Sequence, residues 1–263
     1  MARLRTYDPG VPSWVDVMCH DTAKAATFYR GLFGWEAVSQ GPTEVTGGYA
    51  IFQLDGHDVA GIGPGEQPGW TTYITVADVE KTAALAAEHG AKVLTEPRTV
   101  PSPLTLTDAG RMALLADPEG AVFGVWQPAD HTGADVTGEP GSLRWSELGV
   151  RDVEQAKAFY GALFGWEGET HPFADDTSTY TEFSLPGNDT KVAGMVQMNE
   201  QWPEEIPAHW MVYIAVADAD AAAAQVVELG GTVSVEPFDL PNVGRIAVVN
   251  DVDGSVFSVM APL

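Results

Sequence analysis

Residues 14–35 read WVDVMCHDTAKAATFYRGLFGW, and residues 145–166 read WSELGVRDVEQAKAFYGALFGW. Each stretch opens with a β-like run and then reaches an aspartate that can accept hydrogen bonds from the free amides of a first helical turn. Apolar residues follow at helical spacing, and the glycine of FGW stands where such a helix must stop. Both stretches therefore predict a strand followed by a helix that ends near Gly34 or Gly165.

The repeat extends over almost the whole chain. Further matched pairs are Tyr49 with Tyr180, Trp70 with Trp210, Tyr73 with Tyr213, Gly110 and Arg111 with Gly244 and Arg245, and Asp117 with Asp251. The shift between the copies changes only between blocks of matched residues, which places the insertions in loops. We therefore expect two related folds that face each other across a pseudo-twofold axis.

Each half divides into two modules of one strand, one helix and further strands. The second module begins at Thr71 or Met211 and ends in a strand–turn–strand around DPEG or DVDG, whose glycine is free to take a positive φ. The Gly- and Pro-rich segments 61–69 and 199–207 read as loops before the second module. Four such modules make an α+β protein.

The boundary between the halves is a polar, non-periodic segment. Residues 130–141 read DHTGADVTGEPG, a composition typical of a linker. We therefore predict a first domain over residues 1–129 and a second domain over residues 142–263.

Composition limits the partners. The 263 residues are 45% hydrophobic, enough for two ordinary cores, and 13 Lys+Arg against 37 Asp+Glu give a formal net charge of −24. Such a surface repels phosphate backbones and anionic membranes, so we expect neither nucleic acid nor membrane as a partner. No apolar run approaches the roughly 20 residues of a spanning helix, the N-terminus lacks a signal-peptide core, and the single cysteine, Cys19, excludes an internal disulfide framework. A cytoplasmic protein is expected.

The order of these signals resembles the vicinal oxygen chelate superfamily. A strand that ends in V-x-D, with Cys19 in place of the Val in the first half, a helix that ends in FYxxLFGW and a later D-x-x-G turn before a last strand follow in the same order in both halves. That superfamily includes glyoxalase I, bleomycin-resistance proteins and extradiol dioxygenases. The resemblance implies paired βαβββ modules whose mixed sheets curl into two cups with the helices outside. It also implies, for catalytic members, a divalent metal held by His, Glu or Gln from the first, fifth and eighth strands.

The positions that correspond to those metal ligands hold other residue types. They are Trp14, Thr71 and Gly124 in the first half, and Trp145, Met211 and Ser258 in the second. Trp and Gly offer no side-chain ligand for a hard divalent ion, and Thr, Ser and Met are poor ones. We therefore predict no metal and no other cofactor, and expect no metal-dependent glyoxalase I activity.

The same resemblance predicts what lines the cups. The expected ligand-binding residues are Trp14, Tyr73, Trp126, Trp145, Met211, Tyr213, Ser258 and Met260. Such a wall suits a flat or apolar organic molecule held by stacking and a few polar contacts. Each aromatic residue has an alternative interpretation, in which it simply fills the core of a curved sheet.

One carboxylate per half is expected inside each cup. Asp16 and Glu147 lie two residues after Trp14 and Trp145, hence on the same strand face. Burial raises the pKa of a carboxyl group, which makes both residues candidates for a general acid or base. They could instead hydrogen-bond a hydroxyl or bind a cation. In a purely structural alternative, each pairs with a nearby arginine such as Arg111 or Arg245, or lies at the solvent-exposed rim of its cup.

These observations favour a metal-free, glyoxalase-like or bleomycin-resistance-like protein that binds an antibiotic or another secondary metabolite, apolar or aromatic and, given the negative charge, possibly cationic. One alternative is a lyase, isomerase, cyclase or hydroxylase-type enzyme with Asp16 and Glu147 as acid–base groups. Another is a metal-dependent glyoxalase or dioxygenase whose metal ligands lie at positions other than the six that the resemblance indicates. The sequence leaves open which half works, whether each cup forms within or between the halves, and whether the pseudo-dimer is a monomer or a homodimer.

Overall fold

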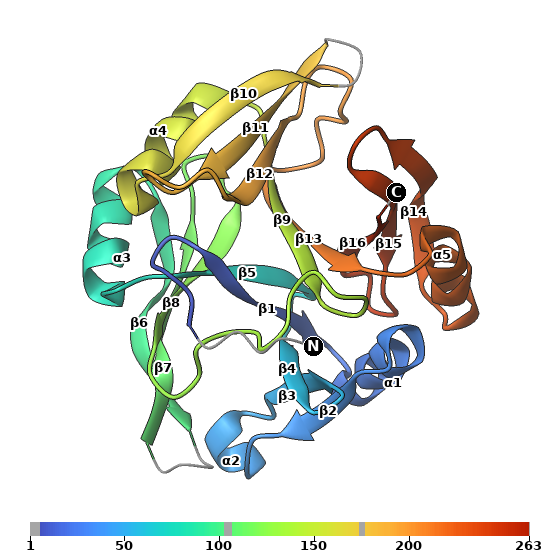
Figure 1. The fold of residues 1–263 in the computed structure, drawn as a ribbon. Coiled ribbons are helices and arrows are strands. Elements are labelled where there is room, and N and C mark those ends of the chain that lie inside the picture. Colours follow the sequence, from blue (N-terminus) through green and yellow to red (C-terminus); the bar gives the residue numbers. More distant parts are fainter. Residues whose placement is uncertain (1–5, 103–106, 174–176, 263) are drawn as a thin grey trace.

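The computed structural model describes residues 6–102, 107–173 and 177–262 (Figure 1). The first half contains β1 (Pro12–Cys19), α1 (Thr22–Phe33), β2 (Glu36–Ser39), α2 (Thr43–Thr46), β3 (Ala50–Leu54), β4 (His57–Pro64), β5 (Gly69–Thr75), α3 (Val79–Glu88), β6 (Lys92–Ser102), β7 (Thr107–Ala116) and β8 (Val122–Pro128). The second half contains β9 (Leu143–Val150), α4 (Val153–Phe164), β10 (Glu167–Phe173), β11 (Ser178–Ser184), β12 (Lys191–Gln197), β13 (His209–Ala215), α5 (Ala219–Glu228), β14 (Thr232–Leu240), β15 (Gly244–Asn250) and β16 (Val256–Ala261).

The described strands form two eight-stranded mixed sheets, one from each half. Sheet A runs β2-β3-β4-β1-β5-β8-β7-β6, and sheet B repeats that order as β10-β11-β12-β9-β13-β16-β15-β14. At the centre of each sheet the first strands of its two modules pair antiparallel, β1 with β5 and β9 with β13. The predicted α+β fold of four βαβββ modules is confirmed, and the strand pairing places each cup within one half.

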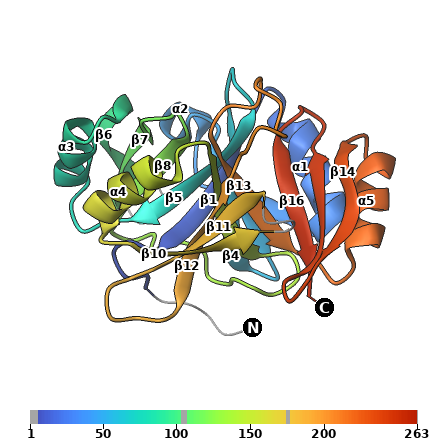
Figure 2. The same ribbon diagram turned by 90° about the horizontal axis from the view of Figure 1, so that it is seen from above.

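The hydrophobic cores, in contrast, are shared between the halves. Helix α1 packs on α5, and α3 packs on α4, so that one pair of helices lies at each end of the molecule with the sheets between them (Figure 2). Beneath α1 and α5, Phe28 and Trp35 of the first half share one core with Val226 and Phe257 of the second. Each sheet is therefore built from one half, whereas each helical layer combines one helix from the first half with one helix from the second.

The FYxxLFGW motif of each half contributes to these shared cores through contacts with the other half. The Tyr29 hydroxyl donates to Asp251 Oδ2 over 2.8 Å, and the Tyr160 hydroxyl donates to Asp117 Oδ2 over 3.0 Å. Both aspartates begin the D-x-x-G turn of the opposite half, where the other carboxylate oxygen accepts two backbone amides of its own turn. The two most recognisable motifs of the sequence thus meet at the junction of the halves.

The tryptophan that closes each motif also reaches across the junction. Trp35 Nε1 donates to the carbonyl of Gly141 over 2.7 Å, and Trp166 Nε1 donates to the carbonyl of Gly10 over 2.8 Å. Both acceptors lie just before the first strand of a half, β9 or β1. The indole N–H groups, which are buried and need a partner, therefore fix the approach of one half to the other.

The local predictions hold in most places. Asp21 accepts from the amides of Ala23 and Lys24 at the start of α1, and Gly34 ends that helix with a φ of 75°. The prediction of a loop from residue 61 was wrong, because Gly61 lies within β4. The short helix α2 was not predicted. None of the described helices has the length and apolarity needed to cross a membrane.

Candidate functional site

Strand register assembles the first candidate site, cup A, which we define by Trp14, Asp16, Tyr73 and Trp126. Trp14 and Asp16 share one face of β1, and Trp14 pairs with Tyr73 on β5. Tyr73 pairs in turn with Gly124 on β8. Trp14, Tyr73 and Trp126 form an apolar cluster separate from the two cores under the helices, which places them on the opposite face of sheet A.

A hydrogen-bonded chain links the aromatic wall of cup A to its carboxylate. Trp14 Nε1 donates to the Tyr49 hydroxyl over 3.0 Å, and this hydroxyl donates to Asp16 Oδ2 over 3.2 Å. Tyr49 comes close only because β4 carries Gly61 at this point, where an added Cβ would lie 1.9 Å from the tyrosine oxygen. The strand glycine that resembled a loop residue is thus a requirement of the site.

Asp16 is almost fully enclosed, with 4% of its surface exposed. Burial raises the pKa of its carboxyl group to about 7, although Tyr73 and Tyr49 act in the opposite direction. Its second oxygen, Oδ1, is buried and makes no hydrogen bond of normal geometry with the residues described. The sequence-based expectation of a carboxyl group inside an aromatic cup with a raised pKa agrees with this arrangement.

Cup B, which we define by Trp145, Glu147, Tyr213 and Met260, repeats the arrangement in the second half. The Tyr213 hydroxyl donates to Glu147 Oε1 over 2.7 Å. Trp145 Nε1 donates to the Tyr180 hydroxyl over 2.9 Å, as Trp14 does to Tyr49. Burial raises the pKa of Glu147, while Tyr213 and Tyr180 lower it.

Besides Asp16 and Glu147, three pairs of equivalent lining residues differ between the two cups. Met211 of β13 occupies the position of Thr71, opposite the carboxylate-bearing residue of the neighbouring strand. Ser258 occupies the position of Gly124, where an added Cβ would lie 2.1 Å from the Tyr73 ring. Met260 replaces Trp126. The flexible thioethers make the wall of cup B more adaptable than that of cup A.

Cup A also receives a residue from the segment between the domains. The ring of His131 lies edge-on to Trp14 with 4.4 Å between centroids, and its centroid is 5.8 Å from that of Trp126. Trp126 Nε1 donates to the carbonyl of His131 over 2.9 Å. The predicted linker is therefore part of this site.

The arginine alternative for the carboxylates was wrong. Arg111 pairs with Glu80 and also donates to Thr99, whereas Arg245 binds Asp220 and Asp239. These are partly exposed ion pairs, and no arginine appears among the causes that shift the pKa of Asp16 or Glu147. The carboxylates of the cups are held by tyrosines instead.

Sequence reasoning missed Tyr49, Tyr180 and His131. A signal existed for the two tyrosines, since they match in the repeat as well as the tryptophans they bind. No comparable signal marked His131, which has no matched partner and lies in a segment without periodicity.

The donor set at the family's metal positions does not fit a divalent ion. In the structure, as in the sequence, these positions offer indole, hydroxyl and thioether side chains or none. Within residues 6–102, 107–173 and 177–262, no cluster of three or more His, Cys, Asp or Glu side chains is placed to bind a metal.

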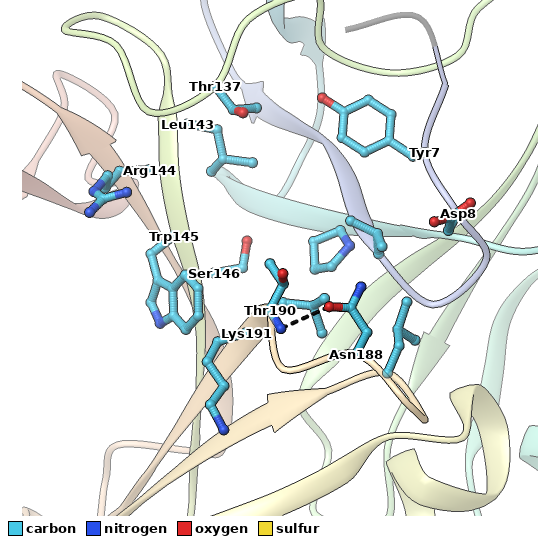
Figure 3. A pocket seen from close by; sticks show the side chains of 14 residues that line it. Tyr7, Asp8, Thr137, Leu143, Arg144, Trp145, Ser146, Asn188, Thr190 and Lys191 are labelled. Atoms are coloured by element: carbon cyan, nitrogen blue, oxygen red, sulfur yellow. Dashed lines mark hydrogen bonds between the residues drawn. The ribbon is translucent and has the colours of Figure 1, made fainter.

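A separate cleft of about 230 Å³ lies between the halves near the start of β1 and β9 (Figure 3). Tyr7, Arg144, Trp145 and Lys191 are among its lining residues, and the Asn188 side chain beside it accepts from the Thr190 amide over 2.9 Å. Its mixed, charged lining differs from the aromatic walls of the cups. Only Trp145 is common to this cleft and to the residues that define cup B.

Comparisons with known proteins agree with this geometry. Residues 130–259 match the Glyoxalase/Bleomycin resistance protein/Dioxygenase superfamily, and residues 14–126 match a family described as Glyoxalase-like domain. The chain is 38% identical over 270 residues to "Putative glyoxylase CFP32" of Mycobacterium tuberculosis, with 100% of this chain and 98% of the relative covered. It is 36% identical over 276 residues to the anthracycline biosynthesis protein DauV of Streptomyces sp. (strain C5), with 98% and 95% covered.

Solved structures share the fold at low sequence identity. The Mn(II)-bound glyoxalase from Novosphingobium aromaticivorans has a TM-score of 0.64 at 14% identity, with 97% of this chain and 83% of the other covered. The 2,3-dioxygenase LapB from Pseudomonas sp. KL28 has a TM-score of 0.62 at 15% identity, with 96% and 93% covered. With the two sequence relatives matched over nearly their full length, the chain belongs to the glyoxalase/bleomycin resistance/dioxygenase superfamily.

Proposed function

We propose that this protein binds a small, flat, largely apolar or aromatic organic molecule of the secondary-metabolite type in its cups. The observation that carries the proposal is that each cup encloses one carboxyl group within a wall of tryptophan and tyrosine. The aromatic faces supply contact area for a ring system, and the carboxyl group supplies one directional hydrogen bond. No step of this binding requires a metal.

Charge and relatives support the choice of ligand class. A formal net charge of −24 attracts cations and repels anions, so a flat molecule with an amino group fits better than a carboxylate or phosphate. Two relatives that are 36% identical over nearly their full length carry the name anthracycline biosynthesis protein. Anthracyclines are flat, fused-ring compounds, and those with an amino sugar are cationic.

Titration with an amino-sugar anthracycline tests the proposal. We expect saturable quenching of tryptophan fluorescence, because Trp14, Trp126 and Trp145 line the cups, and a matching heat in calorimetry. Replacing Trp145 by Ala should weaken the interaction about tenfold or more if cup B takes part, since a buried aromatic contact is lost. The absence of both quenching and heat with a panel of flat aromatic amines would contradict the proposal.

Acid–base catalysis by Asp16 is the second candidate, and the enclosure of this carboxyl group in the aromatic wall, with 4% of its surface exposed, is the observation that favours it, because burial raises its pKa to about 7. A carboxyl group of that pKa exists in both protonation states near neutral pH, so it can take a proton from one atom of a bound molecule and return it to another. An isomerisation that moves one proton needs only this transfer. A lyase reaction also breaks the bond to a leaving group of the metabolite, and the proton that Asp16 took up could then be returned to that leaving group.

The variant Asp16→Asn separates catalysis from binding. We expect conversion of a metabolite identified by mass spectrometry to fall by about 10²–10⁴-fold, the usual contribution of a positioned acid–base group, while binding changes far less. Equal losses of binding and turnover would assign Asp16 to binding alone.

A further inference from the structure

We propose that His131 and Asp16 together form a polar contact site in cup A that selects a flat ring bearing a hydroxyl or amino hydrogen-bond donor. The inference rests on the proposed function and narrows it to one cup and one kind of ligand group.

The backbone of His131 is held in place by the fold. The His131 amide donates to the carbonyl of Ala109 over 3.0 Å, and its carbonyl accepts from Trp126 Nε1 over 2.9 Å. Three residues further on, the Ala134 amide donates to the carbonyl of Ser13 next to Trp14 over 2.8 Å. The segment between the domains is thus hydrogen-bonded along cup A on both sides of the imidazole, which is a preorganised contact group.

Two buried polar atoms near Trp14 make no hydrogen bond of normal geometry. Asp16 Oδ1 and His131 Nε2 both lack a hydrogen bond to any residue that the structure describes. The other oxygen of Asp16 accepts from Tyr49, so the two oxygens of the carboxyl group have different surroundings. The Tyr73 hydroxyl lies close enough to the carboxyl group to lower the pKa of Asp16 as a hydrogen-bond donor, but it makes no hydrogen bond of normal geometry to Oδ1. Buried polar atoms are nearly always hydrogen-bonded, so two orphans in one cup require an explanation.

A bound molecule would satisfy both atoms. Trp14 connects the two groups, because its ring contacts the His131 ring and its Nε1 reaches Asp16 through Tyr49. A flat ring beside Trp14 can donate from a hydroxyl or amino group to Asp16 Oδ1 and share a second hydrogen bond with His131 Nε2. Asp58 and Asp135 also lie close enough to act on His131, which disfavours an anionic ligand.

Two matched probes test the site: 2-naphthol, which has a hydroxyl donor, and 2-methoxynaphthalene, which has none. We expect calorimetry to give wild-type protein about tenfold higher affinity for 2-naphthol, the usual effect of one hydrogen bond. His131→Phe keeps a ring over Trp14 but removes Nε2, and should abolish most of that preference, as should Asp16→Asn. The exposed His89 provides the control His89→Phe, which should leave the preference unchanged.

Equal affinity for the two probes, or full preference in His131→Phe, would overturn the inference. Failure of wild-type protein to bind either probe would overturn it as well, whereas the broader proposal fails only with the panel of flat aromatic amines. A second readout avoids dependence on a folded variant. In ¹⁵N-histidine-labelled wild-type protein, 2-naphthol should shift the His131 Nε2 resonance and 2-methoxynaphthalene should not. An unmoved resonance counts against the site.

Discussion

Asp16 and Glu147 occupy equivalent positions on β1 and β9, but their surroundings differ. Asp16 is 4% exposed, and its Oδ1 makes no hydrogen bond of normal geometry, whereas the longer Glu147 is half-buried and accepts from the Tyr213 hydroxyl over 2.7 Å. Each carboxyl group accepts one tyrosine hydroxyl, that of Tyr49 or that of Tyr213, so the two groups differ in exposure to solvent and not in the number of these hydrogen bonds. The two cups therefore hold a carboxyl group in surroundings that differ in exposure to solvent.

Asp16 should make the protein less stable as the pH rises. Its pKa is about 7 in the folded protein against an ordinary 3.8, so between these values the folded state binds the proton that the unfolded state has lost. Unfolding free energy should therefore fall from about pH 4 to about pH 7, by at most about 4 kcal/mol, and then level off for this residue.

Asp16→Asn should remove this component, so the variant gains stability over wild type mainly above pH 7. Urea unfolding of both proteins at pH 5 and pH 8 measures the difference. Asp189→Asn, at an exposed turn between β11 and β12, is the control. Parallel pH dependence in wild type and Asp16→Asn would refute the expectation.

At the scale of elements, each FYxxLFGW helix is hydrogen-bonded to the D-x-x-G turn of the other half. A helix of one half presents a tyrosine to the aspartate that begins a turn of the other half. The aspartate fixes its own turn through two backbone amides and the opposite helix through the tyrosine. The motif therefore records a contact between distant elements as well as a local helix end.

Removal of one turn aspartate should show this double role. Asp251→Ala leaves the amides of Asp253 and Ser255 and the Tyr29 hydroxyl without their acceptor, so we expect a loss of about 2–4 kcal/mol in unfolding free energy. Tyr29→Phe removes the inter-half bond alone and should cost about 1 kcal/mol. Urea denaturation of both variants compares them. Equal losses would mean that the turn amides contribute nothing.

At the scale of the whole molecule, the boundary between the two sheets does not coincide with the boundary between the two hydrophobic cores. Each sheet is built within one half, but both helical cores draw residues from both halves. A half separated from its partner would expose Phe28 and Trp35, or Phe159 and Trp166, to water. Large apolar patches of that kind drive association or loss of fixed packing.

Residues 1–129 produced alone should therefore not give a folded monomer. We expect self-association, or weak near-ultraviolet circular dichroism without a sharp unfolding transition. Mixing with residues 130–263 should give a heterodimer with the near-ultraviolet circular dichroism of the intact protein, because the second half supplies the missing faces of both cores. Size-exclusion chromatography with light scattering and near-ultraviolet spectra give the answer. A monomeric first half with cooperative unfolding would contradict this prediction.

The site was predictable where it depends on one strand. Period-two alternation puts Trp14 and Asp16 on one face, and the repeat then identifies Trp145 and Glu147. Tyr49 and His131 were missed, because their roles depend on Gly61 admitting a tyrosine and on the path of a polar segment across a curved sheet. Neither property has a local sequence pattern.

The sequence by itself determined the four modules, their helix ends and the absence of metal-binding side chains from the family's ligand positions, since each follows from local spacing and residue type. The tertiary structure alone decided that cups form within halves while cores form between them, and that His131 enters cup A. Local spacing fixes which face of an element is apolar. Which distant face covers it depends on the packing of the whole chain, because burial is not directional.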